Sequence, residues 1–397
     1  MNTPATTAIA NTASAALRDR IRDVQEAARG VTTLYPRSYI LQCIKEDRFP
    51  DELWLKLGEF GLLGLSVPEE YGGSGGGVLE ITALNEALAL AGVPTLFLVV
   101  TGLGRVPIMR NGTPEQIRKF VTPTCTGEKK LCFAITEPNA GTNSFAMTTL
   151  ATPDGDGWVL NGQKVFISGA RDADYMLVIA RTTKAGEVKN RTEGISLFVL
   201  DMKTPGIQLT QLNIQVETAE RQYMVFFDNV KLPADALIGE AGKGAKLMFE
   251  GLNSERLLAA GAAIGLGDYA LAKAVAYSKD RKPFGKPIGS YQALQHRMAQ
   301  AKAQIEAARL MTYNAAERFD AGEDAGAHAN MAKLLGSQAA VAAVEAALQT
   351  HGGYGFDRDY DIVTLWPMVR LLEIAPINNE MLLNYIGEHV LGLPKSY

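Results

Sequence analysis

The feature that most constrains this fold is a change of residue pattern in the middle of the chain. From about Cys132 to Ile238, apolar residues occur in short or alternating runs separated by turn signals such as Asp154–Gly157 and Asn161-Gly162. This spacing is typical of an antiparallel sandwich or barrel. On both sides of this block, apolar residues recur at spacings of three and four, which indicates helices. We therefore expect an α+β chain in which a β domain lies between two helical domains.

The pattern also predicts where the domains and their elements lie. The expected domains are an all-α domain at 1–130, a β domain at 131–240 and a helical domain at 241–397. The runs expected to form strands are 147–150, 158–160, 175–180, 194–200, 207–212 and 223–227. The C-terminal helices are expected at 254–279, 290–321, 325–350 and 378–390. Their short connections predict an antiparallel four-helix bundle.

One of these helices shows a single narrow apolar seam. It consists of Leu294, Met298, Ala301, Ile305 and Ala308, at alternating spacings of four and three. Such a seam packs against neighbouring helices. The Ala-rich faces of these helices suit either close packing within the bundle or packing between subunits, and the sequence leaves both open.

Charge and hydropathy exclude several classes of partner. The 39 Lys and Arg residues against 43 Asp and Glu residues give a net charge of -4, which disfavours binding to a nucleic-acid backbone. The longest uncharged run, Ala87–Gly104, is interrupted by Gly92 and Pro94. It therefore predicts two buried helical pieces with a break between them, and no membrane insertion.

Cysteine and histidine spacing gives no sign of a metal or disulfide framework. The three cysteines, Cys43, Cys125 and Cys132, form no CxxC pattern, so we expect small buried residues in a reducing compartment. The four histidines lack metal-ligand spacing, and we expect no metal site. The first eighteen residues lack Asp, Glu and an apolar stretch. We expect a frayed N-terminus and a cytoplasmic protein, with a mitochondrial matrix location still open.

A glycine-rich stretch at Glu69–Gly77 is expected to be a loop. Within it, Gly72–Gly76 fits the pattern GxSxG of a hydrolase nucleophile elbow. That elbow requires a strand before it and a helix after it, and glycine tracts match the pattern by chance. No dinucleotide-binding spacing of glycines is present either.

Four segments carry the functional signal of this sequence. The first is Cys132–Ser144, a strand that leads into a hydroxyl-rich turn, and the second is the strand segment Val165–Gly169. The third is Arg281-Lys282-Pro283-Phe284-Gly285-Lys286-Pro287-Ile288 followed by Gln292. The fourth is Gln349 followed by His351-Gly352-Gly353-Tyr354-Gly355.

These segments resemble, in the same order, motifs of the acyl-CoA dehydrogenase family. The first is similar to the TEPxAGS loop, with Thr142 where the motif has Ser, and the second to the strand beside the flavin ring. The third and fourth are similar to RxxFGxxI…Q and QxxGGxG. The resemblance covers nearly the whole chain. It implies a flavoprotein that binds FAD, dehydrogenates an acyl-CoA thioester between its α and β carbons, and passes the electrons to an electron-transfer flavoprotein.

The residue types in these segments suit a flavin nucleotide. Ile135, Thr136, Phe166 and Ser168 offer backbone donors, hydroxyls and an aromatic face to the isoalloxazine ring; without the resemblance they would be ordinary barrel strands. Arg281 offers a planar fork for a diphosphate, and a glycine pair permits close backbone approach. The full set of FAD contacts that the resemblance implies is Phe133, Ile135, Thr136, Gly141, Thr142, Phe166, Ser168, Arg281, Phe284, Gln292, Gln349, Gly352, Gly353, Asn378 and Glu380.

The resemblance also implies a homo-oligomer, either a dimer or a tetramer. In this family, residues at the positions of Arg281, Phe284 and Gln292 reach the FAD of a neighbouring subunit. A helix-terminal surface Arg is the ordinary alternative for Arg281 in an unselected sequence.

The catalytic base of the family is a Glu in a dry pocket, because desolvation strengthens a carboxylate as a base. Members place it either in a loop before the last helix or on a helix that reads Glu-Arg early in the C-terminal domain. Counting without a gap from the glycine pair, the loop position falls on Pro376, which has no carboxylate. The helix position falls on Glu255, followed by Arg256, and the resemblance therefore implies that Glu255 is the base.

Two alternatives to this assignment remain. Glu255 follows Asn253 and Ser254, so it could simply be an acidic residue favoured by a helix N-terminus. Glu373 is the other candidate base, although a Glu so close to Arg370 is expected to form an ordinary ion pair. The substrate contacts that the resemblance implies are Thr142, Asn253 and Arg256.

Proline at position 376 has a second consequence, because it lacks an N–H group. In the family, the backbone N–H at this position binds the thioester oxygen, so either Ala375 or Ile377 must replace it or the chemistry differs. Alternatives on the same fold are an enoyl-CoA reductase, an oxidase, a flavin monooxygenase, a non-catalytic flavin or acyl-CoA binding protein and a DNA-associated flavoprotein. The net charge of -4 argues against the last of these.

Overall fold

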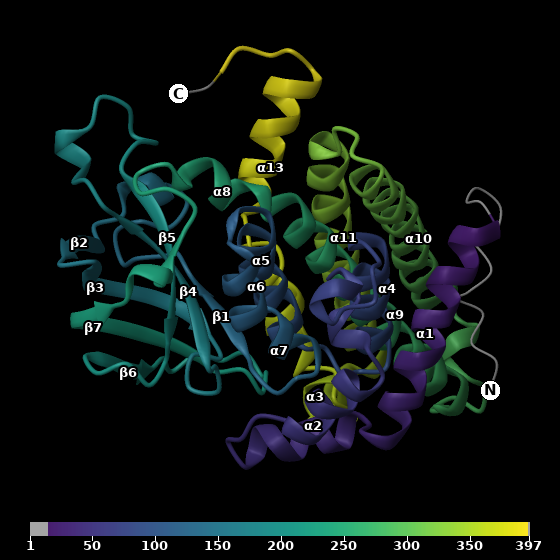
Figure 1. Cartoon of the computed structure of the whole chain (residues 1–397). Coiled ribbons are helices and arrows are strands. Elements are labelled where there is room, and N and C mark those ends of the chain that lie inside the picture. Colours follow the sequence, from purple (N-terminus) through teal and green to yellow (C-terminus); the bar gives the residue numbers. More distant parts are fainter. Residues whose placement is uncertain (1–14, 396–397) are drawn as a thin grey trace.

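Within the described residues, helices lie on both sides of a central block of strands, as the sequence predicts. The computed structural model describes residues 15–395, and the expected frayed segment at the N-terminus lies largely outside this range. Figure 1 shows the strands gathered on one side of the molecule and the long helices on the other, with α5 between them.

The N-terminal region consists of short helices around an apolar core. The helices are α1 (Ala15–Leu34), α2 (Arg37–Lys45), α3 (Asp51–Glu59), α4 (Val78–Leu90), α5 (Leu96–Asn111), α6 (Pro114–Phe120) and α7 (Thr122–Cys125). The predicted break within Ala87–Gly104 is confirmed, because α4 ends at Leu90 and α5 begins at Leu96. The expected loop after Glu69 is also present and leads directly into α4.

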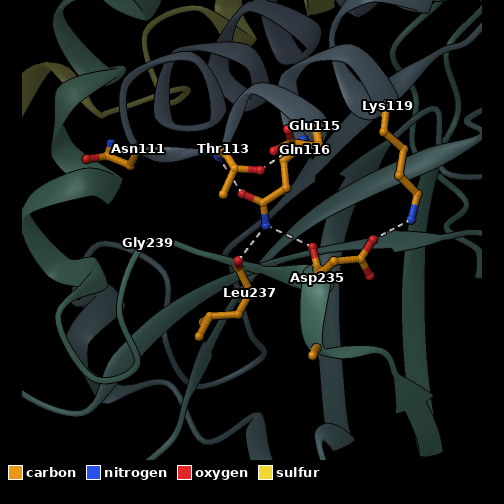
Figure 2. A pocket seen from close by; sticks show the side chains of 9 residues that line it. Asn111, Thr113, Glu115, Gln116, Lys119, Asp235, Leu237 and Gly239 are labelled. Carbon is orange, nitrogen blue, oxygen red and sulfur yellow. Dashed lines mark hydrogen bonds and ion pairs between the residues drawn. The ribbon is translucent and has the colours of Figure 1, made fainter.

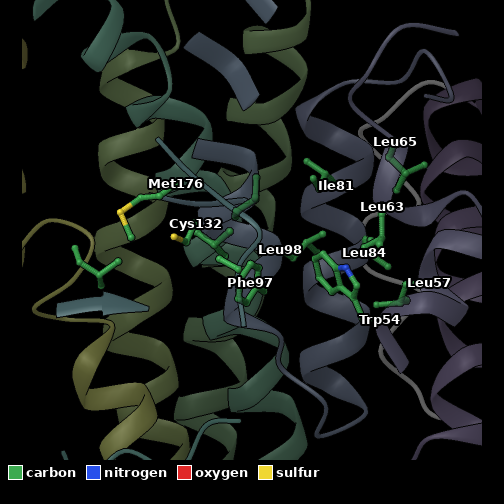
Figure 3. Close-up of a cluster of buried hydrophobic side chains, with 14 of the residues drawn as sticks. Trp54, Leu57, Leu63, Leu65, Ile81, Leu84, Phe97, Leu98, Cys132 and Met176 are labelled. Carbon is green, nitrogen blue, oxygen red and sulfur yellow. The ribbon is translucent and has the colours of Figure 1, made fainter. Parts of the chain in front are cut away.

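The core of this region continues into the β domain (Figure 3). The Trp54 ring on α3 packs edge-on against the Phe97 ring on α5, with their centroids 5.7 Å apart. Cys132 and Met176 of the β domain are fully buried in the same cluster. All three cysteines are buried and unpaired, which agrees with their prediction as small core residues.

The middle of the chain forms one eight-stranded sheet. Its strands are β1 (Leu131–Ala134), β2 (Leu150–Asp154), β3 (Gly157–Ser168), β4 (Tyr175–Arg181), β5 (Ile195–Asp201), β6 (Ile207–Gln211), β7 (Gln222–Leu232) and β8 (Leu237–Ile238). The order is β6-β7-β3-β2-β4-β5-β8, with β1 paired to β4. Most pairings are antiparallel as expected, but β1 and β2 pair with β4 in parallel.

The prediction of a turn at Asn161-Gly162 is wrong, because both residues lie inside β3. The register between β3 and β7 shifts between Leu160 and Gly162, so this pair forms a bulge. Gly162 has φ of +141°, and a Cβ there would lie 2.7 Å from the backbone of Thr149. Asn-Gly therefore permits close backbone approach within a strand rather than a chain reversal. Of the expected strand at 147–150, only Leu150 belongs to β2.

The C-terminal region is built on three long helices. Its helices are α8 (Gly244–Glu250), α9 (Leu252–Asp280), α10 (Gln292–Asp320), α11 (Gly326–His351), α12 (Leu365–Leu371) and α13 (Asn379–Tyr385), the last continued by a π-helical turn at Ile386–Val390. Together, α13 and this turn span residues 379–390, which agrees with the fourth predicted helix at 378–390. The predicted seam of α10 is buried at Ala301, Ile305 and Ala308, and half-buried at Leu294 and Met298.

Small residues bring α9 and α11 close together along their length. A Cβ on Gly336 would lie 3.3 Å from the Cα of Ala260, and one on Gly267 would lie 3.3 Å from that of Ala340. From the first of these contacts to the second, residue numbers increase on both helices, so α9 and α11 run parallel. The helix α10, which lies between them in sequence, returns in the opposite direction. The N-terminal α4 also packs on α9, since a Cβ on Gly261 would lie 2.8 Å from the Thr82 carbonyl oxygen.

Two helical stretches, Gly244–Asp280 and Gly326–Phe356, are long and apolar enough to cross a membrane by length and composition alone. Within them, 72% and 61% of the most apolar window is buried inside the protein. Core helices buried in a folded protein can be equally long and apolar, so length and composition are only weak evidence that either stretch spans a membrane.

Candidate active site

The first turn of α9 presents a carboxylate with an unusual environment. Glu255 is half-buried, and within the described residues its carboxylate accepts no hydrogen bond. Burial raises the pKa of Glu255 to about 8, and the positive charges of Arg256 and Lys333 oppose this rise only partly. A carboxylate in this state is a stronger base than an exposed one.

The other two residues predicted on this turn lie beside the carboxylate. The Arg256 guanidinium donates to the side-chain oxygen of Asn253 over 2.6 Å. The Arg256 Nε is buried and has no hydrogen-bond partner within the described residues, and burial lowers the pKa of this side chain. This unsatisfied donor is therefore available to a ligand that enters beside Glu255.

Two predicted residues far apart in sequence meet at the edge of this site. The Asn378 amide donates to the Thr142 hydroxyl over 3.2 Å. The Asn378 side-chain oxygen also accepts from the Met381 N–H at 2.9 Å and so caps α13. The turn after β1 and the loop before α13 are thereby joined, and Gly141 and Glu380, which were predicted in the same two segments, are exposed.

The loop before α13 also decides between the two candidates for the missing N–H group. The Ala375 N–H donates to the Leu371 carbonyl oxygen over 2.8 Å and is therefore occupied. Among the hydrogen bonds of residues 15–395, none uses the Ile377 N–H. Ile377 is thus the residue that has a free backbone donor next to Pro376.

Glu373, the second candidate base, has the environment of an ordinary ion pair. Its carboxylate lies 2.9 Å from the Arg370 guanidinium, one turn earlier in the chain. A carboxylate held by a cation is a weaker base than a desolvated one without a partner. The local geometry therefore favours Glu255 over Glu373.

The turn after β1 is held by a buried ion pair that the sequence analysis missed. Lys164 Nζ lies 2.9 Å from a Glu137 carboxylate oxygen and 2.9 Å from the Ile135 carbonyl oxygen. The Glu137 carboxylate also accepts from the Thr148 N–H at 2.6 Å and from the Thr149 N–H at 3.0 Å. The pair thus holds both ends of the loop that contains Thr142.

The charges of this pair stabilise each other inside the protein. Burial lowers the pKa of Lys164 to about 8. Burial alone would raise the pKa of Glu137, but the Lys164 charge and the hydrogen bonds hold it below its ordinary value. The signal that could have found the pair is a Lys at an inward position of a strand opposite a Glu in a hydroxyl-rich turn.

The strand predicted to lie beside a flavin ring exposes an aromatic side chain. Phe166 has φ of +59° at a register shift of β3, and its side chain is 59% exposed. The neighbouring Val165 N–H donates to the Thr136 carbonyl oxygen over 2.9 Å, which joins the two predicted segments. Ser168 is half-buried beside Gln222, and Phe133 and Ile135 are half-buried on and after β1.

The remaining predicted residues gather at the opposite end of α9. Arg281, Gln349, Gly352 and Gly353 line one open pocket of about 620 Å³, together with aromatic residues including Tyr277. Gly352 has φ of +61°, and a Cβ on either glycine would meet no atom within 4 Å. The glycines therefore leave open space in this pocket, in which a phosphate group fits.

Two predicted residues lie outside this pocket lining. Phe284 is 82% exposed, and Gln292 at the start of α10 is also exposed. Their exposure on the segment after Arg281 suits contacts with a second chain.

A further pocket, of about 430 Å³, contains none of the predicted residues (Figure 2). Its Gln116 amide donates to the carbonyl oxygens of Asp235 and Leu237 at 2.9 and 2.8 Å. Lys119 pairs with the Asp235 carboxylate at 2.8 Å. These polar groups attach α6 to the chain before β8, so we interpret them as structural.

Comparison with known proteins covers this chain nearly from end to end. It matches family models described as "Acyl-CoA dehydrogenase, N-terminal domain" at residues 18–128, "middle domain" at 132–230 and "C-terminal domain" at 242–391. It is 41% identical to acyl-CoA dehydrogenase FadE12 of Mycobacterium tuberculosis, over 91% of this chain and 94% of that protein.

Two further similarities bear on the chemistry. The chain is 33% identical to the caffeyl-CoA reductase-Etf complex subunit CarC of Acetobacterium woodii, over 88% of this chain and 93% of that protein. The solved structure of butyryl-CoA dehydrogenase from Megasphaera elsdenii superposes with a TM-score of 0.88 at 33% identity, and the match covers 94% of this chain and 98% of the other.

Proposed function

This chain belongs to the acyl-CoA dehydrogenase family of FAD-binding oxidoreductases, and on that premise we propose that it dehydrogenates an acyl-CoA thioester with Glu255 as its base. The observation that carries this proposal is the half-buried Glu255 carboxylate, which has no hydrogen bond within the described residues and a raised pKa. No other candidate position combines a carboxylate with this desolvation, because Pro376 has none and Glu373 is paired.

The proposed reaction removes two hydrogens from adjacent carbons of the acyl chain. Glu255 takes the proton from the α carbon, the electron pair of that C–H bond forms the α,β double bond, and the hydride leaves the β carbon. FAD, when bound, supplies the hydride acceptor. Glu255 performs this step in its ionised form, so its pKa of about 8 makes the rate depend on pH in the physiological range.

The developing charge on the thioester oxygen needs a donor near Glu255. We assign this role to the Ile377 N–H, which makes no hydrogen bond within residues 15–395 and follows Pro376 directly. Such a donor contributes about 3 kcal/mol to the transition state in other oxyanion sites. Arg256 and Asn253 on the same turn as the base, and Thr142 across from Asn378, are the proposed substrate contacts.

The residues present fit FAD in two separate places. Thr136, Phe166 and Ser168 offer hydroxyls and an exposed ring near the β domain, while the open pocket at Arg281 offers a cation and bare glycine backbone for a diphosphate. The first turn and the end of α9 are about 39 Å apart at 1.5 Å per residue. Because Arg281 lies at the opposite end of α9 from the proposed base, we propose that it binds the FAD of a neighbouring chain in a homo-oligomer.

An electron-transfer flavoprotein is the proposed partner that reoxidises the flavin. A relative that covers most of this chain carries Etf in its name as part of one complex. The same relative is named a reductase, which makes enoyl-CoA reduction on the same fold the second candidate function. Anaerobic addition of enoyl-CoA to dithionite-reduced protein separates the two, because a reductase reoxidises its flavin rapidly with this substrate.

The test of the proposed function is the visible spectrum of the purified protein. We expect yellow protein with about one FAD per chain, because each chain supplies one cofactor site. Anaerobic addition of a panel of acyl-CoA thioesters should bleach the flavin absorbance with at least one of them. Protein that stays colourless after reconstitution with FAD would contradict the proposal, and rapid oxygen consumption by the reduced protein would favour an oxidase.

A second prediction concerns the pocket at the end of α9. Arg281→Ala should weaken FAD retention and also lower the mass of the oligomer in light scattering, because one diphosphate contact bridges two chains. The matched control is Arg318→Ala, which removes an exposed Arg at the end of α10 that pairs with Glu323. Unchanged FAD affinity and unchanged mass in Arg281→Ala would count against the bridging role.

A further inference from the structure

The ammonium group of Lys333 lies buried beside the proposed site, and neither the sequence motifs nor the proposed reaction uses it. Lys333 lies on α11 and is only 1% exposed. Nζ donates to the Ile377 carbonyl oxygen over 2.6 Å and to the Asn379 side-chain oxygen over 2.9 Å. Ser337, one turn further along α11, donates to the same Asn379 oxygen at 3.2 Å.

This arrangement is costly for a purely structural contact. Within the described residues, no carboxylate lies within 4.0 Å of Lys333, so both acceptors of the buried ammonium are neutral. Transfer of a charge into the interior is unfavourable unless it is paired. A neutral side chain could hold the same loop at lower cost, which indicates that the charge itself has a use.

The helix packing places this charge at the level of the proposed base. Gly336 on α11 faces Ala260 on the parallel α9, with only 3.3 Å between an added Cβ and the Ala260 Cα. Lys333 lies about one turn before Gly336, and Glu255 lies just over one turn before Ala260. The charges of the two side chains act on each other, and each shifts the pKa of the other.

We propose that Lys333 is a positioning residue for the reaction, which fixes the Ile377–Asn379 loop and places a positive charge at the level of the first turn of α9, where Glu255 lies. The anchor acts on the carbonyl of Ile377, the residue whose N–H is the proposed donor to the thioester oxygen. The anchor also holds Asn379, next to the Asn378 that contacts Thr142. This inference rests on the proposed function for its catalytic part.

Other charges around Lys333 must be included when its effect is tested. Besides Glu255, these are Glu373 after α12, Arg256 on α9 and Glu380 on α13. Burial lowers the pKa of Lys333 to about 8, with the three carboxylates acting in the opposite direction. Removal of Lys333 takes one positive charge from this group and leaves Arg256 as its cation.

The first test follows the pH dependence of flavin reduction in the FAD-loaded protein. Lys333→Met should move the rising limb of the rate to higher pH by about half a unit or more, because loss of a nearby cation disfavours the ionised carboxylate. Lys333→Gln should give the same shift, since it is also neutral. The matched control is Lys302→Met on α10, which loses ion pairs to Asp268 and Glu306 and should leave the limb unchanged.

The second test measures the loop without turnover. In Lys333→Met, hydrogen exchange at the amides of 377–382 should accelerate about tenfold or more, because the loop loses its anchor. Lys302→Met should leave exchange there unchanged. This measurement decides the anchoring role even where Glu255→Gln shows that the proposed base is wrong, so failure of the two proposals can be told apart.

The inference would be overturned if Lys333→Met folds and its loop exchanges hydrogen at the wild-type rate. It would also be overturned if the pH–rate profile of Lys333→Met matches that of the wild type although Glu255→Gln abolishes flavin reduction. Where Lys333→Met does not fold, Asn379→Ala tests the same anchor from the loop side. It keeps the ammonium but removes one acceptor, so loop exchange should accelerate and the limb should stay in place. Unchanged exchange in Asn379→Ala would also overturn the inference.

Discussion

Replacement of Glu255 by Gln is expected to slow flavin reduction by a bound acyl-CoA about a hundredfold or more, while acyl-CoA binding persists. Gln keeps the size of the side chain and one acceptor oxygen but cannot take the α proton. The carboxylate accepts no hydrogen bond within the described residues, so the substitution leaves no partner unsatisfied. Anaerobic stopped-flow absorbance measures the rate, and titration with a non-reducing acyl-CoA analogue measures binding.

The matched control is Glu373→Gln, which alters the other candidate carboxylate near the same loop. Because Glu373 pairs with Arg370 at 2.9 Å, its loss should have a small effect on the rate. The reverse result, in which Glu373→Gln abolishes reduction and Glu255→Gln does not, would show that the final loop rearranges to supply the base. If neither substitution matters, the protein does not abstract an α proton, and the reductase and non-catalytic alternatives gain support.

The pH profile of the same reaction gives an independent check on the base. In the wild-type protein, the rate should rise with pH through about 8, because the ionised form of Glu255 accepts the proton and its pKa is raised to that value. Bound substrate changes the desolvation of the carboxylate, so the pH dependence of this rate reports the pKa of Glu255 in the enzyme–substrate complex. Glu255→Gln should lose this limb in its residual rate.

Much of the fold could be predicted because its elements have strong periodic signals. The long helices α9, α10 and α11 lie within a few residues of the predicted ranges. The strands β3 to β7 were also located, whereas the strand predicted at 147–150 shares only Leu150 with β2. Residues 161 and 162 were misassigned because an Asn-Gly pair has the same composition in a turn and in a bulge, and only the close approach of Thr149 distinguishes the two. The parallel pairing of β1 with β4 depends on contacts that no local pattern records.

The site was predicted only where a motif marks it. Thr142 lies in a matched segment and Asn378 in the loop reached by counting from the glycine pair, and the structure brings the two together. Lys333 and Lys164 carry no such mark, because a single Lys within an Ala-rich helix or an alternating strand looks like a solvent-facing residue. Their burial follows from packing between distant elements: α11 with the loop before α13, and β3 with the turn after β1.

Lys164 gives the second large prediction, because its pair with Glu137 is buried at both ends. Lys164→Met should lower the free energy of unfolding by about 3–5 kcal/mol, since it leaves the Glu137 carboxylate inside the protein without its cation. The loop that carries Thr142 should loosen at the same time, because Glu137 binds the Thr148 and Thr149 amides. Urea denaturation of the FAD-loaded protein measures the loss, and release of FAD fluorescence reports the site.

Two controls separate the unpaired charge from the lost packing. Lys129→Met removes a half-exposed Lys that pairs with Asp174 at 3.0 Å, and such pairs contribute about 1 kcal/mol or less. The double variant Glu137→Gln with Lys164→Met removes both charges but keeps only one acceptor oxygen, so one of the Thr148 and Thr149 N–H groups loses its partner. If the unpaired carboxylate causes the loss, the double variant must be more stable than Lys164→Met alone. Equal stability of the two would instead mean that lost hydrogen bonds, to the Ile135 carbonyl in both variants and to one Thr amide in the double variant, outweigh the unpaired charge.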